Sequence, residues 1–163
     1  MRFLGNIEAK ADDKGRVFLP AQFRKALLTA GDETLVVRMD VFQSCLVIYP
    51  ESVWNQQTDW LRSHLSRWRA RDQQIYRQFV SAAAEITLDS SGRMLIPRRL
   101  LQAAGINREM RFIGMGDTIE IWGGADERNF MDKDEFAGAL EDIMNGSGST
   151  ADSDDRQDNN KEK

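Results

Sequence analysis

The sequence predicts an α+β fold in which one small, β-rich module occurs twice. The first observation is an internal repeat: DDKGRVFLP at residues 12–20 returns 77 residues later as DSSGRMLIP at 89–97. The second is that β-rich and helical runs follow each copy in the same order. The third is a segment between the copies, residues 55–80, that has helical periodicity and contains neither proline nor glycine. A repeat of this kind predicts two related structural units.

Each copy contains the pattern Asp-x-x-Gly-Arg, which predicts a tight hairpin turn. The aspartate side chain can accept hydrogen bonds from backbone N–H groups ahead of it, and glycine tolerates the positive φ of such a turn. We therefore assign a structural role in the turns to Asp12 and Gly15 in the first copy, and to Asp89 and Gly92 in the second.

A short apolar strand, ended by a proline, is predicted after each turn. The runs VFL at 17–19 and MLI at 94–96 are apolar, and β-branched and aromatic residues favour strands. Pro20 and Pro97 lack the N–H that would continue a strand ladder, and their fixed φ suits the start of a helix. We expect a helix to begin directly after each proline.

The first of these helices is predicted to be amphipathic. Helical spacing places Phe23 and Leu27 on one face, with Arg24 and Lys25 on the other. Glycine is the residue that most often ends a helix in the left-handed conformation. A glycine suited to that role follows each helical run, namely Gly31 and Gly105.

Two further β-rich runs complete each module. In the first copy they are LVV at 35–37 and LVIY at 46–49. We align LVV with FIG at 112–114 and, after removing four residues, LVIY with IEIW at 119–122. Each half is therefore predicted to run strand, turn, strand, short helix, strand, loop, strand.

The segment between the modules is predicted to be helical and amphipathic. Its apolar stripe consists of Trp54, Leu61, Leu65, Trp68, Ile75 and Phe79, and its positive charge comes from Arg62, Arg67, Arg69, Arg71 and Arg77. The arginines either line a groove for a polyanion or form a solvated face that pairs with the seven acids of residues 126–142, and we favour the second. The predicted organisation is a first module at 1–50, a helical linker at 51–79, a second module at 80–123, a C-terminal helix at 124–145 and a disordered acidic tail at 146–163.

Composition argues against an exported protein and against an enzyme. Cys45 is the single cysteine, which excludes an internal disulfide and favours a reducing cytoplasm. We expect it to be half-buried, and we expect His64, the single histidine, on a helix surface. No catalytic triad, phosphate loop or dinucleotide fingerprint is present, so we expect no catalytic residue, no metal and no cofactor. The N-terminal residues have no long apolar run, so no signal peptide or membrane span is expected.

Charge is distributed unevenly along the chain. The net charge is −4, but residues 126–163 contain twelve acidic and five basic residues, which leaves residues 1–125 with an excess of three positive charges. A basic body with an acidic tail gives modest support to a polyanionic partner.

The repeated signature, in which Asp-x-x-Gly-Arg is followed by three apolar residues and a proline, resembles the swapped-hairpin modules of the AbrB superfamily. Two copies about 77 residues apart, joined by helices, resemble the MraZ family over residues 1–145. The resemblance implies two swapped-hairpin β-barrel modules that pack as a pseudo-dimer and assemble into a homo-oligomeric ring. It also implies a cytoplasmic, nucleoid-associated regulator that binds double-stranded DNA, at repeats in the promoter of its own division and cell-wall operon. No membrane or small-molecule partner is expected.

The resemblance also implies site residues. The family's Asp-x-x-x-Arg motif falls on Asp12 and Arg16, and again on Asp89 and Arg93. The second copy has Ser91 where the first has a lysine, so we expect its surface to bind DNA more weakly. The DNA-contacting residues implied are Arg16, Lys14, Lys10, Arg24, Lys25 and Arg93.

Alternatives remain open at this point. Arg16 could serve only as the ion-pair partner of Asp12 across the turn, and the same holds for Arg93 in the second copy. An AbrB-like antitoxin, with one DNA-binding module and a disordered partner-binding tail, is the main alternative function, and the duplication argues against it. A small hydrolase or transferase is the least favoured.

Overall fold

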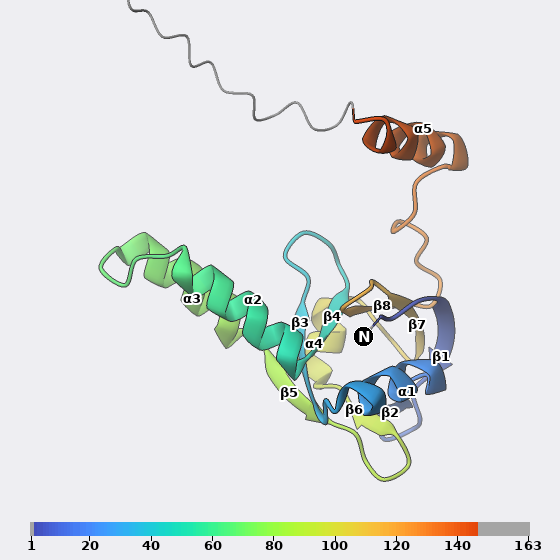
Figure 1. Cartoon of the computed structure of the whole chain (residues 1–163). Coiled ribbons are helices and arrows are strands. Elements are labelled where there is room, and N and C mark those ends of the chain that lie inside the picture. The colour runs from blue at the N-terminus through green and yellow to red at the C-terminus, as the bar shows by residue number, and fades with distance from the viewer. Residues whose placement is uncertain (1, 147–163) are drawn as a thin grey trace, which may run out of the picture. The chain divides into compact units, whose positions relative to one another are not determined.

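The computed structural model describes residues 2–146 and shows a mixed α+β protein, as predicted (Figure 1). The chain forms two compact units, one ending at Asp126 and the other beginning at Glu127. In the first unit the elements are β1 (Asn6–Lys10), β2 (Arg16–Phe18), α1 (Ala21–Ala30), β3 (Thr34–Met39), β4 (Leu46–Pro50), α2 (Glu51–Ser63), α3 (Ala70–Ser81), β5 (Ala84–Thr87), β6 (Arg93–Leu95), α4 (Arg98–Ala103), β7 (Glu109–Gly114) and β8 (Ile119–Gly123). Both halves have the predicted order of strands and helix.

Strands from the two halves are interleaved in the first unit. A six-stranded antiparallel sheet has the order β1-β7-β8-β4-β3-β5, and β2 pairs with β6 in a separate two-stranded sheet. The first hairpin, β1 and β2, thus pairs with strands of the second half. Among the described residues, β1 and β5 are the two edge strands of this sheet and do not pair with each other. The sheet is therefore open, and the expected closed barrel is not formed.

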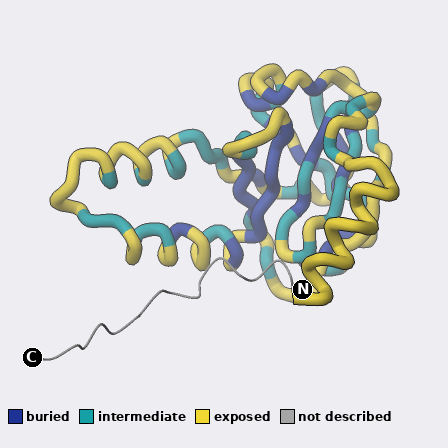
Figure 2. The backbone as a smooth tube through the Cα atoms, turned by 90° about the horizontal axis from the view of Figure 1, so that it is seen from above, coloured by how far each residue is buried: buried dark blue, intermediate teal, exposed yellow. Residues whose placement is uncertain are grey.

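One hydrophobic core is shared by both halves, and Figure 2 shows the buried residues concentrated in the sheet region. Phe23 and Leu27 of α1 are buried in it, as their helical spacing predicts. They join Met94 and Phe112 of the second half, which are also buried. Because fewer than about 70 residues seldom bury enough apolar surface to fold alone, each half depends on the other.

The two halves differ in the length of their first helix. Helix α1 has ten residues and α4 has six.

The strand register corrects one detail of the predicted repeat alignment. Leu35 faces Pro50 across β3 and β4, whereas Met110 faces Gly123 across β7 and β8. Because β4 and β8 align as predicted, Pro50 and Gly123 are equivalent, and so are their partners Leu35 and Met110. The predicted alignment of residues 35–37 with residues 112–114 was therefore wrong by two residues.

The linker is a helical hairpin that extends away from the sheets (Figures 1 and 2). The uniform helix expected through residues 55–80 breaks at residues 64–69, between α2 and α3. The carboxylate of Asp72, in the first turn of α3, accepts a hydrogen bond of 2.7 Å from the backbone N–H of Ser66, which ties the broken segment to the returning helix. The rings of Trp54 and Phe79 stack at 5.4 Å across the hairpin. Trp68 is 94% exposed, so the predicted apolar stripe is not one packed face.

The second unit contains helix α5 (Lys133–Met144), within the predicted C-terminal helix. The side chain of Asp132 caps it by accepting hydrogen bonds from the backbone N–H groups of Asp134 and Glu135. The predicted disordered tail lies, from residue 147 on, outside the described residues. Among residues 2–146, none of the helices combines the length and the hydrophobicity needed to cross a membrane.

Candidate nucleic-acid interface

The two-stranded sheet of β2 and β6 presents a small exposed surface. Val17 pairs with Met94, its own counterpart in the repeat, and both are buried in the core. Antiparallel partners point to the same side of a sheet and neighbours along a strand alternate, so the flanking residues share the opposite face. We call this the ribbon face, and its residues are Arg16, Phe18, Arg93 and Leu95.

The turn before β2 is organised around the carboxylate of Asp12. Its Oδ1 accepts hydrogen bonds of 2.9 Å from the backbone N–H groups of Lys14 and Arg16. Its Oδ2 accepts a hydrogen bond of 2.9 Å from the Nε of Arg16. Gly15 has a φ of 84°, in the left-handed region that favours glycine.

The turn before β6 repeats this geometry. The Oδ1 of Asp89 accepts 2.9 Å hydrogen bonds from the backbone N–H groups of Ser91 and Arg93, and its Oδ2 accepts one of 3.0 Å from the Nε of Arg93. Gly92 has the same φ of 84°. Each ribbon-face arginine is therefore held by the aspartate four residues before it.

The hydrogen bonds in both turns favour the ionised form of the two carboxylates. The backbone N–H of Arg16 is the largest influence that lowers the pKa of Asp12, and the backbone N–H of Arg93 has the same effect on the pKa of Asp89. The guanidinium groups lower both pKa values further. Both aspartates are charged acceptors at neutral pH, and their bonds to Nε orient the two arginines.

The ion pairs leave the ends of the arginines available. Both hydrogen bonds use the Nε atom, so the terminal nitrogens keep their donors, although the Nη1 of Arg93 also lies 4.0 Å from the Oδ2 of Asp12. Within residues 2–146, the terminal nitrogens of Arg16 have no hydrogen-bond partner, and its side chain is 33% exposed. The ion pair with Asp12 and a ligand contact are consequently compatible roles for Arg16.

Arg24 joins the first helix to the second turn. Its Nη1 donates a hydrogen bond of 3.3 Å to the backbone carbonyl oxygen of Ser91, and its side chain covers Gly92 so closely that a Cβ there would collide with it. Lys25, the next residue of α1, is exposed, as is Lys14 in the first turn. The structure therefore brings Arg24 to the same turn as Arg93, although 67 residues separate it from Ser91.

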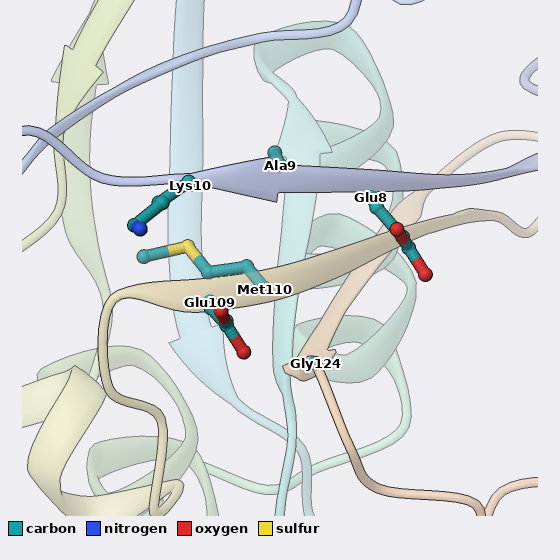
Figure 3. Close-up of a pocket in the computed structure, with 6 residues that line it drawn as sticks. All are labelled: Glu8, Ala9, Lys10, Glu109, Met110 and Gly124. Atoms are coloured by element: carbon teal, nitrogen blue, oxygen red, sulfur yellow. The ribbon is translucent and has the colours of Figure 1, made fainter.

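Lys10 lies in a different setting, an open hollow beside the end of β1. Six residues line the hollow: Glu8, Ala9, Lys10, Glu109, Met110 and Gly124 (Figure 3). Lys10 faces Glu109 across the strands, and the two side chains point apart in Figure 3. The lining carries two glutamates and one lysine, which disfavours a phosphate in this hollow.

Sequence reasoning missed the two apolar members of the ribbon face. Phe18 is 53% exposed and Leu95 is 58% exposed. Strand alternation could have identified them, because residues two apart share a face and Phe18 follows Arg16 by two. Sequence reasoning also missed an ion pair of 2.8 Å that ties Asp13 in the first turn to Arg108.

Cys45 and His64 lie away from the ribbon face elements. Cys45 is fully buried rather than half-buried, and burial raises the pKa of its thiol to about 12. His64 is exposed at the end of α2, as expected, with its ring stacked 3.9 Å from that of Trp60. In the described part of the chain, no group of three or more His, Cys, Asp or Glu side chains is placed to hold a metal ion.

The arginines of the linker are mostly exposed. The guanidinium of Arg62 stacks over the ring of Tyr76 at 3.8 Å. Arg67, Arg69, Arg71 and Arg77 are exposed to solvent. Their pairing with the acids of residues 126–142 stays a prediction.

Comparison with known proteins identifies the family. The sequence model of a family described as "MraZ protein, putative antitoxin-like" matches residues 2–76 and 79–140. A protein of Bacteroides fragilis named "Transcriptional regulator MraZ" is 55% identical over 145 residues, which cover 88% of this chain and 92% of that protein. A protein of the same name from Bacteroides thetaiotaomicron is 55% identical over 146 residues, which cover 89% of this chain and 94% of that protein. Another, from Christiangramia forsetii, is 31% identical over 142 residues, which cover 87% of this chain and 85% of that protein. The chain therefore belongs to the MraZ family.

Proposed function

We propose that this protein is a transcription regulator that binds double-stranded DNA through the ribbon face and its two turns. The observation that carries the proposal is the pair of arginines, Arg16 and Arg93, each anchored through Nε with donors left at its terminal nitrogens. A two-stranded β-ribbon fits the major groove of DNA, and arginine can bind the N7 and O6 atoms of guanine with two hydrogen bonds. The names of the relatives support a role in transcription.

The remaining predicted site residues have supporting roles in this proposal. Phosphate contacts come from Lys14, from Lys25 and from the Arg24 donors that do not bond Ser91. These contacts make binding dependent on salt. Arg93 contributes less than Arg16, because Ser91 replaces the lysine in its turn. Lys10 contributes least, because its neighbours include two glutamates.

We also propose the finer architecture implied by the resemblance. Residues 1–50 and 80–123 act as two swapped-hairpin modules of a pseudo-dimer, which the pairing of β1 with β7 and of β3 with β5 supports. Several chains assemble into a ring in the cytoplasm, on the nucleoid, and this ring binds repeated sites in the promoter of its own division and cell-wall operon.

The test measures binding of the whole protein to the DNA upstream of its own gene across a salt series. Wild type should bind tightly and weaken steeply with salt. Arg16→Ala should lose affinity by a factor of about 10 to 100, the value of one arginine–guanine contact, without a change in sedimentation coefficient. Arg16→Lys keeps the charge but loses the planar two-donor contact, so it should retain binding that no longer discriminates between sequences. If wild type does not bind this DNA even at low salt, the proposal is wrong.

A second candidate function is partner-binding as an antitoxin, which the words "putative antitoxin-like" in the family description favour. An antitoxin would bind a protein partner tightly through one segment and copurify with it. Purification from the native host, followed by mass spectrometry of stoichiometric partners, distinguishes the two functions.

A further inference from the structure

We infer that Phe18 and Leu95 contact thymine methyl groups in the DNA that the ribbon face binds, so that the ribbon reads thymine as well as guanine. The inference rests on the proposed function and names the second class of base contact at the same site. The two side chains are counterparts in the repeat and lie on the same face as the arginines.

Their exposure needs an explanation. Burying a phenylalanine or leucine side chain stabilises a protein, yet Phe18 and Leu95 remain 53% and 58% exposed. The alternate positions on the same strands, Val17 and Met94, are 1% exposed. One face of the two strands is therefore buried in the core, while the other face keeps two apolar side chains in solvent beside the two arginines.

The neighbours of each apolar side chain indicate what the partner is. Leu95 faces Arg16 across the ribbon, and its Cδ1 would lie 3.6 Å from a Cβ placed on Gly15. Phe18 faces Arg93, whose Cζ is 5.9 Å from the centre of the phenylalanine ring. Each apolar group thus sits beside an arginine whose direction is set by an aspartate.

An arginine beside an apolar group matches the edges of DNA bases in the major groove. Guanine presents two acceptors there, and thymine presents the C5 methyl group, which is the apolar feature of that groove. The surrounding charge favours DNA over an apolar protein partner, since basic side chains lie at both turns beside the ribbon face. These include Lys14, which lies in the first turn, and Arg24, which bonds Ser91 in the second turn.

The ribbon is only approximately symmetric, which adds a specific expectation. Phe18 and Leu95 occupy equivalent positions but differ in size and shape. The two halves of the contacted DNA are therefore read by the pair Arg93 and Phe18 on one side and by Arg16 and Leu95 on the other. We expect two separate thymine positions, each sensitive to one of the two apolar side chains.

Uracil provides the test, because it differs from thymine only by the missing methyl group. The preferred duplex is selected from a random library with the whole wild-type protein, and each thymine is then replaced by uracil, one at a time. Wild type should lose affinity about fourfold at two positions, the effect of withdrawing one methyl group from a contact. Phe18→Ala should bind more weakly and become insensitive to uracil at one of them, and Leu95→Ala at the other. Val41→Ala removes an equally exposed apolar side chain from a distant loop and should respond to uracil as wild type does.

The outcomes separate this inference from the proposed function. If wild type selects no sequence, both fail. If wild type binds and Arg16→Ala does not, yet uracil has no effect at any position, only this inference is wrong. If Phe18→Ala keeps the full uracil response but changes the sedimentation coefficient, the exposed side chains contact a second copy of the chain, and the inference is also overturned.

Discussion

Arg24 of the first helix donates a hydrogen bond of 3.3 Å to the backbone carbonyl oxygen of Ser91, which belongs to the turn of the second half. The equivalent position on the second helix is Leu101, which cannot make this bond to the first turn. The first turn instead carries Lys14 and the ion pair between Asp13 and Arg108. The two copies of one motif are therefore supported by different contacts.

Replacing Arg24 should loosen the second turn selectively. Arg24→Ala removes one exposed hydrogen bond and should lower the free energy of unfolding by on the order of 0.5 kcal/mol. Amide hydrogen exchange should accelerate at residues 89–93 and stay unchanged at residues 12–16. Lys25→Ala, one residue further on, is the matched control and should leave both turns unchanged. Equal acceleration in the two turns would contradict the assigned role.

Acid should destabilise both turns by protonating their aspartates. The pKa values of Asp12 and Asp89 lie below the usual 3.8, because backbone N–H groups bind the ionised carboxylates. The unfolded chain therefore takes up these protons more readily than the folded protein. The stability contributed by the carboxylates is complete well above pH 3.8 and is lost as the pH falls through their lowered pKa values.

Carboxyl NMR titration and thermal unfolding between pH 5 and 3 measure this effect. The double variant with Asp12→Asn and Asp89→Asn should show a shallower loss of melting temperature over this range. Arg16→Ala should leave the pKa of Asp12 below 3.8, since the backbone N–H of residue 16 remains. Titration of either carboxyl at or above 3.8 in wild type would show that the turn hydrogen bonds are absent in solution.

Phe79 should hold the helical hairpin against the sheet. Its ring stacks on Trp54 and lies under the guanidinium of Arg38, whose Cζ is 4.3 Å from the ring centre. Phe79→Ala should destabilise the protein by about 2 kcal/mol, less than the roughly 3 to 5 kcal/mol of a fully buried phenylalanine. Trp68→Ala removes a 94% exposed ring from the same hairpin and should cost less than about 0.5 kcal/mol. Urea unfolding compares the two, and similar losses would contradict the packing.

The thiol of Cys45 should be unreactive in the folded protein. Its pKa is raised to about 12, first by burial and then by the charges of Glu120, Asp40 and Asp126, so almost no thiolate exists at pH 8. At pH 8, a disulfide-exchange reagent should modify the native protein only at the rate at which the fold opens around Cys45. The urea-unfolded protein should react at once. Rapid stoichiometric modification of the native protein would show that Cys45 is accessible.

Local sequence patterns by themselves determine several features of this protein. The repeated Asp-x-x-Gly-Arg turn, the helix starts after Pro20 and Pro97 and the buried face of Phe23 and Leu27 all depend on residues within a few positions of each other. Turn capping, fixed φ and helical spacing act over that range, so the sequence is sufficient to predict them.

Only the tertiary structure decided how the two copies meet. The pairing of β2 with β6 puts Arg16 beside Leu95, and the fold carries Arg24 to Ser91. The stacking of Trp54 on Phe79, which closes the linker into a hairpin, and the complete burial of Cys45 likewise depend on packing between segments far apart in the chain. Strand register between distant segments is set by burial of one face in a shared core, and a single sequence does not state which segments share it.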